Sequence, residues 1–304
     1  MRGGLGTERL VPVASGAGIV AVVAWKPFPS NLPLVRAWRR LGIRAELLGP
    51  SDAHRRLAPG DVALARLDVT PTLDGVEAGL AEISALQRRG VRLLNRPSAL
   101  LAAHDKRETA RLLTKAGLPH PRTMHRERLE EVRVLDPPFV LKPRFGSWGR
   151  DVMLCRDGAE LERCLARIGN RSWFRRHGVL IQELVRPLGY DLRVIVAGER
   201  VVGAERREAA SGEWHTNKAL GGRVVHAQPS EEAGALAIDA ARAVGADLVG
   251  VDLLPVPDIG YVVIEVNGAV DFDDTDSLTG RSVYADAADA LALGADRAAV
   301  GFAR

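Results

Sequence analysis

Strand-like and helix-like segments alternate over the first third of the chain. Short apolar runs, which predict buried strands, occur at residues 18–25, 43–48, 62–67 and 91–95. Between them, apolar residues recur at helical spacing at 32–41 and 74–89. Because strands that alternate with helices form parallel sheets, we expect an α/β domain at residues 1–96. We also expect a loose tail of about a dozen residues before the first strand.

The rest of the chain is richer in strands than in helices. Further strands are predicted at 139–141, 152–154, 179–185, 192–197, 200–206, 222–227, 247–254 and 261–267. Helices are predicted at 105–116, 158–168, 230–244 and 281–293. The segment 186–189 contains proline and glycine, so we expect a hinge there. We therefore divide the remainder into a central subdomain, 97–186, and a C-terminal subdomain, 187–304.

The composition is that of a globular protein and argues against several classes. Of its 304 residues, 46% are hydrophobic and 26% charged, and the formal net charge is +4. The basic residues form no long run and aromatic residues make up only 5%, so we expect no nucleic-acid partner. The apolar run at 17–25 is too short to span a bilayer, so we expect no membrane partner. Two cysteines, Cys155 and Cys164, do not make a secreted disulfide framework, which indicates a cytoplasmic location.

A glycine-containing loop joins two apolar runs at residues 140–151, VLKPRFGSWGRD. The pattern predicts a strand, a loop and a second strand, with Lys142 at the end of the first strand. Gly146 and Gly149 would let the loop close over a ligand, and main-chain N–H groups in such loops can bind phosphate. Lys142 would supply a positive charge to the same phosphates. The alternative is an ordinary hairpin that carries a surface lysine.

Three side chains with oxygen ligands lie on two adjacent predicted strands. Glu265 and Asn267 are two residues apart, so they share one face of a strand, and Asp252 can meet them from the strand before. Such a set suits Mg²⁺, which binds carboxylates together with nucleotide phosphates and water. Glu265 stands in a hydrophobic run, where a carboxylate needs a cation. The alternative is a cluster at the strand ends that is capped by solvent.

Charged residues on other strands and loops are weaker candidates. Arginine can hold phosphate or carboxylate in a bidentate fork, and Arg193 is placed on a predicted strand for this. Strand alternation allows only one of Arg206 and Arg207 to point inward. An acidic loop follows the last strand, with Asp271, Asp273, Asp274 and Asp276. It lacks the spacing of a calcium-binding EF-hand, so we interpret it as a solvated or substrate-facing loop.

Short motifs follow one another in a distinctive order: Asn95-Arg96-Pro97-Ser98, Asp105-Lys106, VLKPRFGSWGR, IQEL at 181–184, Asp191-Leu192-Arg193, Glu205-Arg206-Arg207, Asn217, Gly221-Gly222, Val251-Asp252-Leu253 and Glu265-Val266-Asn267. In this order they resemble the RimK-like ATP-grasp ligases, and the similarity covers residues 95 to about 275. The most similar branch is LysX, which joins α-aminoadipate or glutamate to the acidic carrier protein LysW. Features like that branch are Gly146-Ser147-Trp148-Gly149-Arg150, Thr216-Asn217 before Gly221-Gly222, and Asp271-Phe272 after Asn267. Gly268-Ala269 stands where LysX proteins usually have His-Thr, a change that can alter which amino acid fits.

The resemblance implies a fold, a cofactor set and a site. The fold would be ATP-grasp, of class α/β (α+β), with an N-terminal parallel-sheet pre-ATP-grasp domain and a central lid subdomain. ATP would be bound by Lys106, Lys142, Ser147, Gln182, Glu183, Leu184, Asp191, His215, Thr216 and Asn217. Two Mg²⁺ ions, which Mn²⁺ can replace, would be held by Asp252, Glu265 and Asn267. Arg193 and Arg207 would stabilise an acyl phosphate.

The resemblance also implies an activity and partners. A carboxylate would be phosphorylated by ATP and then attacked by an amine. The partners would be an acidic carrier or peptide that ends in glutamate and an acidic amino acid, α-aminoadipate or glutamate. Similar ligases are often dimers or tetramers, so a homo-oligomer is expected. The alternatives are a RimK-type glutamate ligase that acts on another protein or small molecule, and a nucleotide-binding regulator without catalysis.

Overall fold

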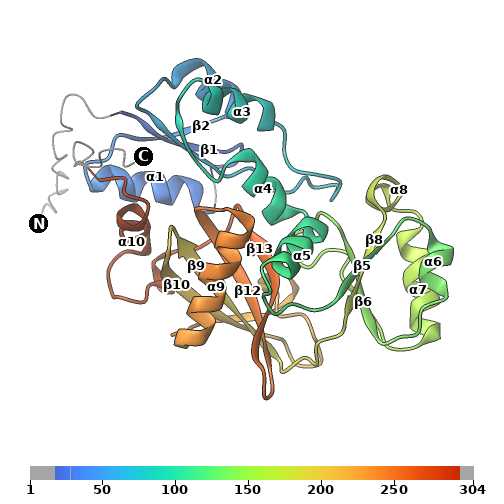
Figure 1. Cartoon of the computed structure of the whole chain (residues 1–304). Helices are drawn as coiled ribbons and strands as arrows, with labels where there is room; N and C mark the ends of the chain where they lie inside the picture. Colours follow the sequence, from blue (N-terminus) through green and yellow to red (C-terminus); the bar gives the residue numbers. More distant parts are fainter. Residues whose placement is uncertain (1–17, 28, 295–304) are drawn as a thin grey trace, which may run out of the picture.

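The computed structural model describes residues 18–27 and 29–294, so the expected N-terminal tail lies outside the described residues. Within the described part, the principal strands form three sheets, which Figure 1 shows with the helices that cover them. The N-terminal and C-terminal sheets lie one above the other on the left of this view, and the central sheet lies to the right. No helix in the described part has the length and apolar character needed to cross a bilayer.

The N-terminal sheet is parallel and has the strand order β2-β1-β3-β4. Its strands are β1 (Val20–Val23), β2 (Ala45–Leu48), β3 (Val62–Ala65) and β4 (Arg92–Leu94). Helix α1 (Asn31–Arg40) packs on one face, and α2 (Pro50–Arg56) and α3 (Leu80–Arg88) pack on the other. The alternation of strands and helices therefore predicted this α/β sheet correctly. The helix expected over 74–89 begins only at Leu80, because the preceding residues form a turn closed by a bridge between Val69 and Val76.

The central sheet is antiparallel, with the strand order β5-β8-β6-β7. Its strands are β5 (Thr123–Arg126), β6 (Phe139–Pro143), β7 (Met153–Cys155) and β8 (Val179–Glu183). Helices α6 (Leu129–Arg133), α7 (Gly158–Ile168) and α8 (Ser172–His177) contribute to its hydrophobic core. The glycine-containing loop joins β6 to β7, as the pattern at 140–151 predicted. Strand β5 was not predicted, because all of its residues are half-buried and show no apolar alternation.

The C-terminal sheet is antiparallel, with the strand order β11-β10-β9-β12-β13. Its strands are β9 (Tyr190–Ala197), β10 (Arg200–Glu208), β11 (Arg223–His226), β12 (Leu248–Val256) and β13 (Gly260–Asn267). One face is covered by α9 (Glu231–Val244), α4 (Pro97–His104) and α5 (Lys106–Lys115). Short 3₁₀ turns are η1 (Lys218–Leu220) and η2 (Asp274–Asp276). Helix α4 was not predicted, because it is apolar on nearly every side and so has no amphipathic stripe.

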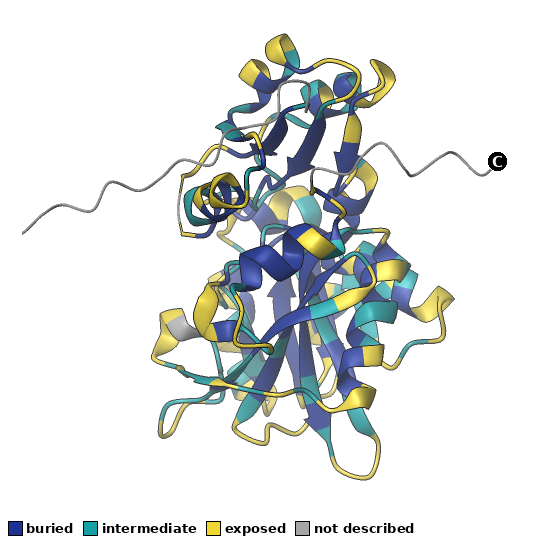
Figure 2. Cartoon of the chain, turned by 90° about the vertical axis from the view of Figure 1, so that its left-hand side faces the viewer, coloured by how far each residue is buried: buried dark blue, intermediate teal, exposed yellow. Residues whose placement is uncertain are grey.

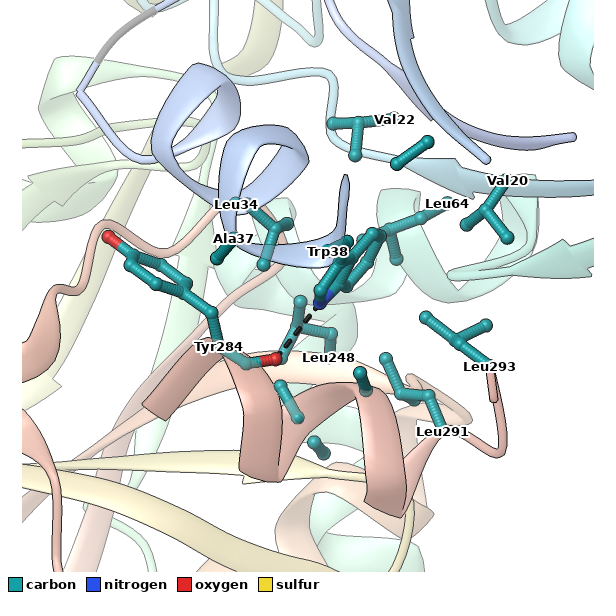
Figure 3. Close-up of a cluster of buried hydrophobic side chains, with 14 of the residues drawn as sticks. Val20, Val22, Leu34, Ala37, Trp38, Leu64, Leu248, Tyr284, Leu291 and Leu293 are labelled. Carbon is teal, nitrogen blue, oxygen red and sulfur yellow. Dashed lines mark hydrogen bonds between the residues drawn. The ribbon is translucent and has the colours of Figure 1, made fainter. Parts of the chain in front are cut away.

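The last helix joins the N-terminal and C-terminal sheets. α10 (Val283–Ala290) packs on α1 and on β10, in one hydrophobic cluster that contains residues from both sheets. Figure 3 shows the centre of this cluster, where the indole Nε1 of fully buried Trp38 donates a hydrogen bond to the carbonyl of Tyr284 at 2.9 Å. In Figure 2 the strands around this joint are buried along most of their length. The packing of α10 on α1 and β10, which we call the joint, holds the N-terminal and C-terminal sheets together.

Candidate active site

A pocket lies between the central and C-terminal sheets, and we name it the inner pocket. It is lined by β6, β8 and strands of the C-terminal sheet, together with the loop after β6. It encloses about 140 Å³. The structure brings together here every residue that was expected at the nucleotide: Lys106, Lys142, Ser147, Gln182, Glu183, Leu184, Asp191, His215, Thr216 and Asn217. Arg207, Asp252 and Glu265 line the same pocket.

Two buried lysines point into the inner pocket. The Nζ of Lys142, on β6, donates a hydrogen bond to the Gln182 side-chain oxygen at 2.7 Å. The Nζ of Lys106, at the start of α5, donates to the Gly146 carbonyl at 2.7 Å and lies 2.8 Å from the Glu265 carboxylate. Burial lowers the pKa of Lys142 to about 7, with a further contribution from the charge of Lys106. An anion in this pocket would therefore favour the charged form of Lys142.

The end of β8 forms the edge of the inner pocket. Gln182 is buried, and its amide nitrogen donates to the Thr123 hydroxyl of β5 at 2.9 Å while its oxygen accepts from Lys142. Glu183 is exposed, and its carboxylate accepts from the Arg122 backbone N–H at 3.3 Å. The side chain of Gln182 is thus fixed by two neighbours before any ligand binds.

A single row of polar side chains, four of them acidic or basic, crosses the C-terminal sheet. Its members are paired from strand to strand in the order His226, Glu205, Arg193, Asp252 and Glu265. Residues directly opposite one another on neighbouring strands project from the same face. The row therefore runs from the inner pocket, at Glu265, to a second cavity on the side of His226.

Two arginines and two aspartates form a buried network in the middle of this face. Arg193 holds Asp252 with two hydrogen bonds, both 2.8 Å, and Arg207 holds Asp191 with bonds of 2.7 and 2.6 Å. Arg207 also lies 2.9 Å from Asp252. The Thr216 hydroxyl donates to Asp191 at 2.6 Å. Arg207 is the inward-pointing member of the Arg206–Arg207 pair, in agreement with strand alternation.

The network fixes the charges of its members. Burial alone would raise the pKa of Asp252, but Arg193 and Arg207 outweigh it and hold that pKa well below its usual range. Burial would likewise lower the pKa of Arg207, but Asp252 and Asp191 raise it above its ordinary value. Both groups are therefore charged across the ordinary pH range.

The loop after β6 closes against the segment 213–217. At Gly149, where φ is +69°, an added Cβ would lie 2.7 Å from the side-chain oxygen of Asn217. The His215 ring bonds to the Val152 carbonyl at 3.1 Å and to the Glu213 carboxylate at 2.8 Å. These contacts join two segments that both line the inner pocket.

The second cavity, which we name the outer chamber, encloses about 610 Å³. It shares Ser147, Arg207 and Asn217 with the inner pocket, so the two spaces adjoin. Arg193 and Asn267, which do not line the inner pocket, line the chamber instead. The chamber is also lined by carboxylates, at Asp68, Glu205, Asp271, Asp273 and Asp276. Three members of the predicted acidic loop therefore face a cavity, whereas Asp274 caps α10 by accepting from Val283 N–H at 3.0 Å.

Residues 103–291, more than half of the chain, match the RimK-like ATP-grasp domain. The chain belongs to the RimK-like ATP-grasp ligase family. The matched residues include all of the lining of the inner pocket. They also include the lining of the outer chamber, except for the residues that the N-terminal domain contributes to it. The expected family and fold class are thus confirmed.

Relatives of this RimK-like chain carry names of synthases and ligases. Human beta-citrylglutamate synthase B is 33% identical over 228 residues, which cover 71% of this chain and 57% of that protein. A probable alpha-L-glutamate ligase of Shewanella loihica is 30% identical over 211 residues, 67% of this chain and 68% of that protein. The chain spans a little over half the length of the animal synthases that it matches.

A solved structure shows the same fold. The ATP-grasp ligase PsnB, complexed with a minimal precursor, Mg and ADP, has a TM-score of 0.64 and 19% sequence identity, covering 90% of this chain and 97% of that chain. ATP-grasp enzymes use ATP and Mg²⁺, so the expected cofactor set is confirmed at the level of the family.

The side chains of this RimK-like chain fit Mg²⁺ by their chemistry. Asp252 and Glu265 are directly opposite on β12 and β13, and the Asn267 amide lies 3.3 Å from Asp252. These are hard oxygen ligands, which suit a Mg²⁺ ion that keeps water and phosphate in its shell. Within residues 18–27 and 29–294, no three or more His, Cys, Asp or Glu side chains are arranged as a group that could hold a metal ion.

Several features of the site were not predicted from the sequence. Asp191 was expected to bind ATP, but its carboxylate already accepts hydrogen bonds from Arg207 and Thr216. Asp105 caps α5 and is held by Arg144 with bonds of 2.8 and 2.6 Å, which ties the α5 end carrying Lys106 to the loop after β6. The motifs contain all of these residues, but their pairing depends on how strands and loops meet in three dimensions.

Proposed function

We propose that this chain is an ATP-dependent carboxylate–amine ligase that forms an amide through an acyl phosphate. The observation that carries the proposal is the pair of adjoining cavities with Arg207 at their boundary. Two lysines and the carboxylates of Asp252 and Glu265 line the cavity on one side of Arg207, and a large polar chamber lies on the other. Such an arrangement can hold a nucleotide next to a second substrate and stabilise the charge that develops between them.

The reaction would proceed in two balanced steps. A carboxylate oxygen attacks the γ-phosphorus of ATP, the bond from that phosphorus to the β-phosphate oxygen breaks, and ADP leaves. An amine nitrogen then attacks the acyl carbon, the bond to the phosphate oxygen breaks, and inorganic phosphate leaves. The ammonium group loses one proton before attack and another as the amide forms, and the phosphate can carry one of them.

We assign roles to residues from where they lie. Lys106 and Lys142 would bind phosphates, because both are buried at the inner pocket and present cationic nitrogens. Asp252, Glu265 and Asn267 would hold Mg²⁺, which when bound neutralises phosphate charge. This requires Lys106 to release Glu265 and interact with phosphate instead.

The other residues expected at the nucleotide would contact its base, its ribose or its phosphates. Gln182, Glu183 and Leu184 would contact adenine, with the Gln182 side chain already fixed by Lys142. Asp191 would meet the ribose only through a lone pair not used by Arg207 and Thr216. Ser147, His215, Thr216 and Asn217 would cover the phosphates from the two segments that meet at Gly149.

The transition state would be stabilised by the two arginines. Arg193 and Arg207 line the outer chamber beside the shared wall, where the acyl phosphate would form. Their bidentate bonds to Asp252 and Asp191 hold the guanidinium groups in place before the substrate arrives.

The inner pocket encloses about 140 Å³, which is less than the ~300 Å³ of ordinary ligand pockets. The loop after β6 would therefore open to admit the nucleotide. Its closure would then protect the acyl phosphate from water.

For the carboxylate substrate we propose a glutamate residue at the end of an acidic peptide or carrier of the LysW kind. The support is the likeness of the loop 146–150 to the LysX branch and the name alpha-L-glutamate ligase among the relatives. A RimK-type ligase that acts on another protein or small molecule is the second candidate, supported by the family match itself.

The test is to trap the acyl phosphate with hydroxylamine. Purified protein is incubated with Mg²⁺-ATP, a peptide that ends in glutamate, and hydroxylamine, and hydroxamate and ADP are measured. We expect both products in equal amounts, and none without the peptide. Lys142→Ala should abolish both, while Lys115→Ala, on the exposed side of α5, should not. The same test is run with a panel of glutamyl, aspartyl and citryl compounds. If none of them increases ADP release above the rate without a carboxylate, the ligase function is refuted.

A further inference from the structure

A groove lies beside the inner pocket, between helix α5 and the central sheet, and we name it the arginine groove. It encloses about 820 Å³, within the range of ~300–1,000 Å³ typical of ligand sites. One wall is α5, with Arg107 and Arg111, and the other is formed by β5 and β8. Leu180 of β8 pairs with Lys142 of β6, so both project from the same face of the sheet. The groove and the inner pocket therefore share one face of the central sheet.

Basic side chains outnumber acidic ones around the arginine groove. Its lining includes four arginines, Arg107, Arg111, Arg122 and Arg144, and two glutamates, Glu108 and Glu183. Glu108 is already neutralised by Arg111, which donates to it at 2.8 and 2.6 Å. Asp105 does not line the groove but accepts from Arg144 at 2.8 and 2.6 Å. Even with Asp105 counted, positive charge is in excess.

Two of these arginines are free to bind an anion. Arg107 at the start of α5 and Arg122 just before β5 are both exposed. Within residues 18–27 and 29–294, their guanidinium groups form no hydrogen bond or ion pair. A surface arginine is ordinarily solvated, but these two line opposite walls of one groove. Because arginine holds carboxylate in a bidentate fork, a chain with several carboxylates can bind both at once.

The arginine groove is close enough to the outer chamber for one peptide to occupy both. Arg144 lines the groove, and Trp148, four residues later in the loop after β6, lines the outer chamber. Because a residue spans at most ~3.6 Å, the two Cα atoms lie within about 14 Å of each other. A peptide segment of about five residues covers that distance. The end of such a peptide can therefore enter the chamber, where the acyl phosphate would form.

We propose that the arginine groove binds an acidic segment of the peptide or carrier substrate, about five residues before the glutamate whose carboxylate reacts. This inference rests on the proposed ligase function. An acidic segment complements the groove in charge, because its carboxylates can bind Arg107 and Arg122. The groove would thus select the substrate by its charge, whereas the two cavities of the site act on its end.

The test uses three peptides that end in the same glutamate. The first has a block of glutamates five residues before its end, the second has glutamines there, and the third has the glutamate block directly before its end. Affinity is measured by fluorescence anisotropy, with the enzyme saturated by Mg²⁺ and a non-hydrolysable ATP analogue. The first should bind about tenfold more tightly than the second, the effect of two exposed ion pairs, and added salt should reduce the difference. The third should form hydroxamate more slowly than the first, because its acidic block cannot lie in the groove while its end is in the chamber.

Variants locate the effect within the molecule. Arg107→Gln and Arg122→Gln should each weaken binding of the first peptide about three- to fivefold and leave binding of the second unchanged. Arg88→Gln, at an exposed arginine of α3, is the matched control. Equal affinity for the first two peptides, a preference that persists in the Arg107→Gln/Arg122→Gln double variant, or an equal loss in Arg88→Gln would overturn the inference. Failure of hydroxamate formation with every peptide would refute the ligase instead, and the affinities would still decide whether the groove binds acidic chains.

Discussion

Binding of Mg²⁺-ATP above neutral pH should be accompanied by uptake of a proton at Lys142. In the free protein, burial and the nearby Lys106 lower the pKa of Lys142 to about 7. Phosphates in the inner pocket would favour the charged lysine and so raise that pKa. A group that is neutral when free and charged when bound takes up a proton on binding.

The magnitude follows from the titration of this one group. At pH 8 only about one Lys142 in ten is protonated in the free protein, so nearly a full proton is taken up on binding. The charged form is present below pH 7 and is lost as the pH rises, so the affinity should fall with rising pH. Between about pH 6.5 and pH 8.5 the protonated fraction falls about twentyfold, equivalent to ~2 kcal/mol of binding free energy.

The assay is calorimetry of ATP binding, with excess Mg²⁺, in buffers of different ionisation enthalpy. The slope of the apparent binding enthalpy against the buffer enthalpy gives the number of protons taken up. Lys142→Met should reduce the slope and flatten the pH dependence of the affinity, whereas Lys115→Met, at an exposed lysine, should leave both as in the parent protein. A parent protein that binds ATP with no proton uptake at pH 8 would contradict the assignment of Lys142 to the phosphates.

Three further predictions use the same structure. Glu265→Gln should lower kcat at least a hundredfold, because it removes a carboxylate from the proposed Mg²⁺ site. Asp252→Asn should in addition cost about 3 kcal/mol in the free energy of unfolding, because Arg193 loses its charged partner and Arg207 keeps only Asp191. Glu265→Gln should cost less stability, because Lys106 keeps its hydrogen bond to the Gly146 carbonyl. Denaturant unfolding and steady-state kinetics measure both effects. Gly222→Ala should raise KM for ATP, because its Cβ would lie 2.2 Å from a carbonyl oxygen of the segment over the inner pocket, and Gly158→Ala, with no atom within 4 Å, is the matched control. Trp38→Phe should lower the free energy of unfolding by about 1–3 kcal/mol in chemical denaturation, because the Tyr284 carbonyl loses its buried donor. A stable Asp252→Asn protein, or equal KM values for the two glycine variants, would contradict the corresponding argument.

Helices and strands could be predicted from the sequence where a helix has one buried face or where a strand is buried on both faces. Helix α9 shows the first case: Ser230 caps its start, Gly245 ends it in a left-handed conformation, and small residues form its buried stripe. Strand β1 shows the second, as a short apolar run. Helix α4 gave no signal because it contacts neighbours on several sides, so its pattern has no helical period.

The site could be predicted as a set of residues but not as an arrangement. Motif order indicated which side chains belong together, because the motifs lie at strand ends and in loops that meet in one place. The pairing of Asp191 with Arg207 depends on the register of β9 and β10. The row from Glu205 to Glu265 depends on β9 lying beside β12, which are far apart in the chain. Neither follows from local periodicity. The domain bounds and the roles of individual site residues stay predictions.

The joint between α1 and α10 has a consequence for the order of events during synthesis. Beside this joint, the Ser30 hydroxyl just before α1 accepts from the Phe272 N–H at 2.8 Å across 242 residues of sequence, and both residues line the outer chamber. Contacts between such distant residues carry the largest loop-closure entropy and form late. A nascent chain on the ribosome can assemble the N-terminal and central sheets before α10 emerges. It would have no closed outer chamber until Tyr284 has been released from the exit tunnel, so this chamber would be the last part of the site to form.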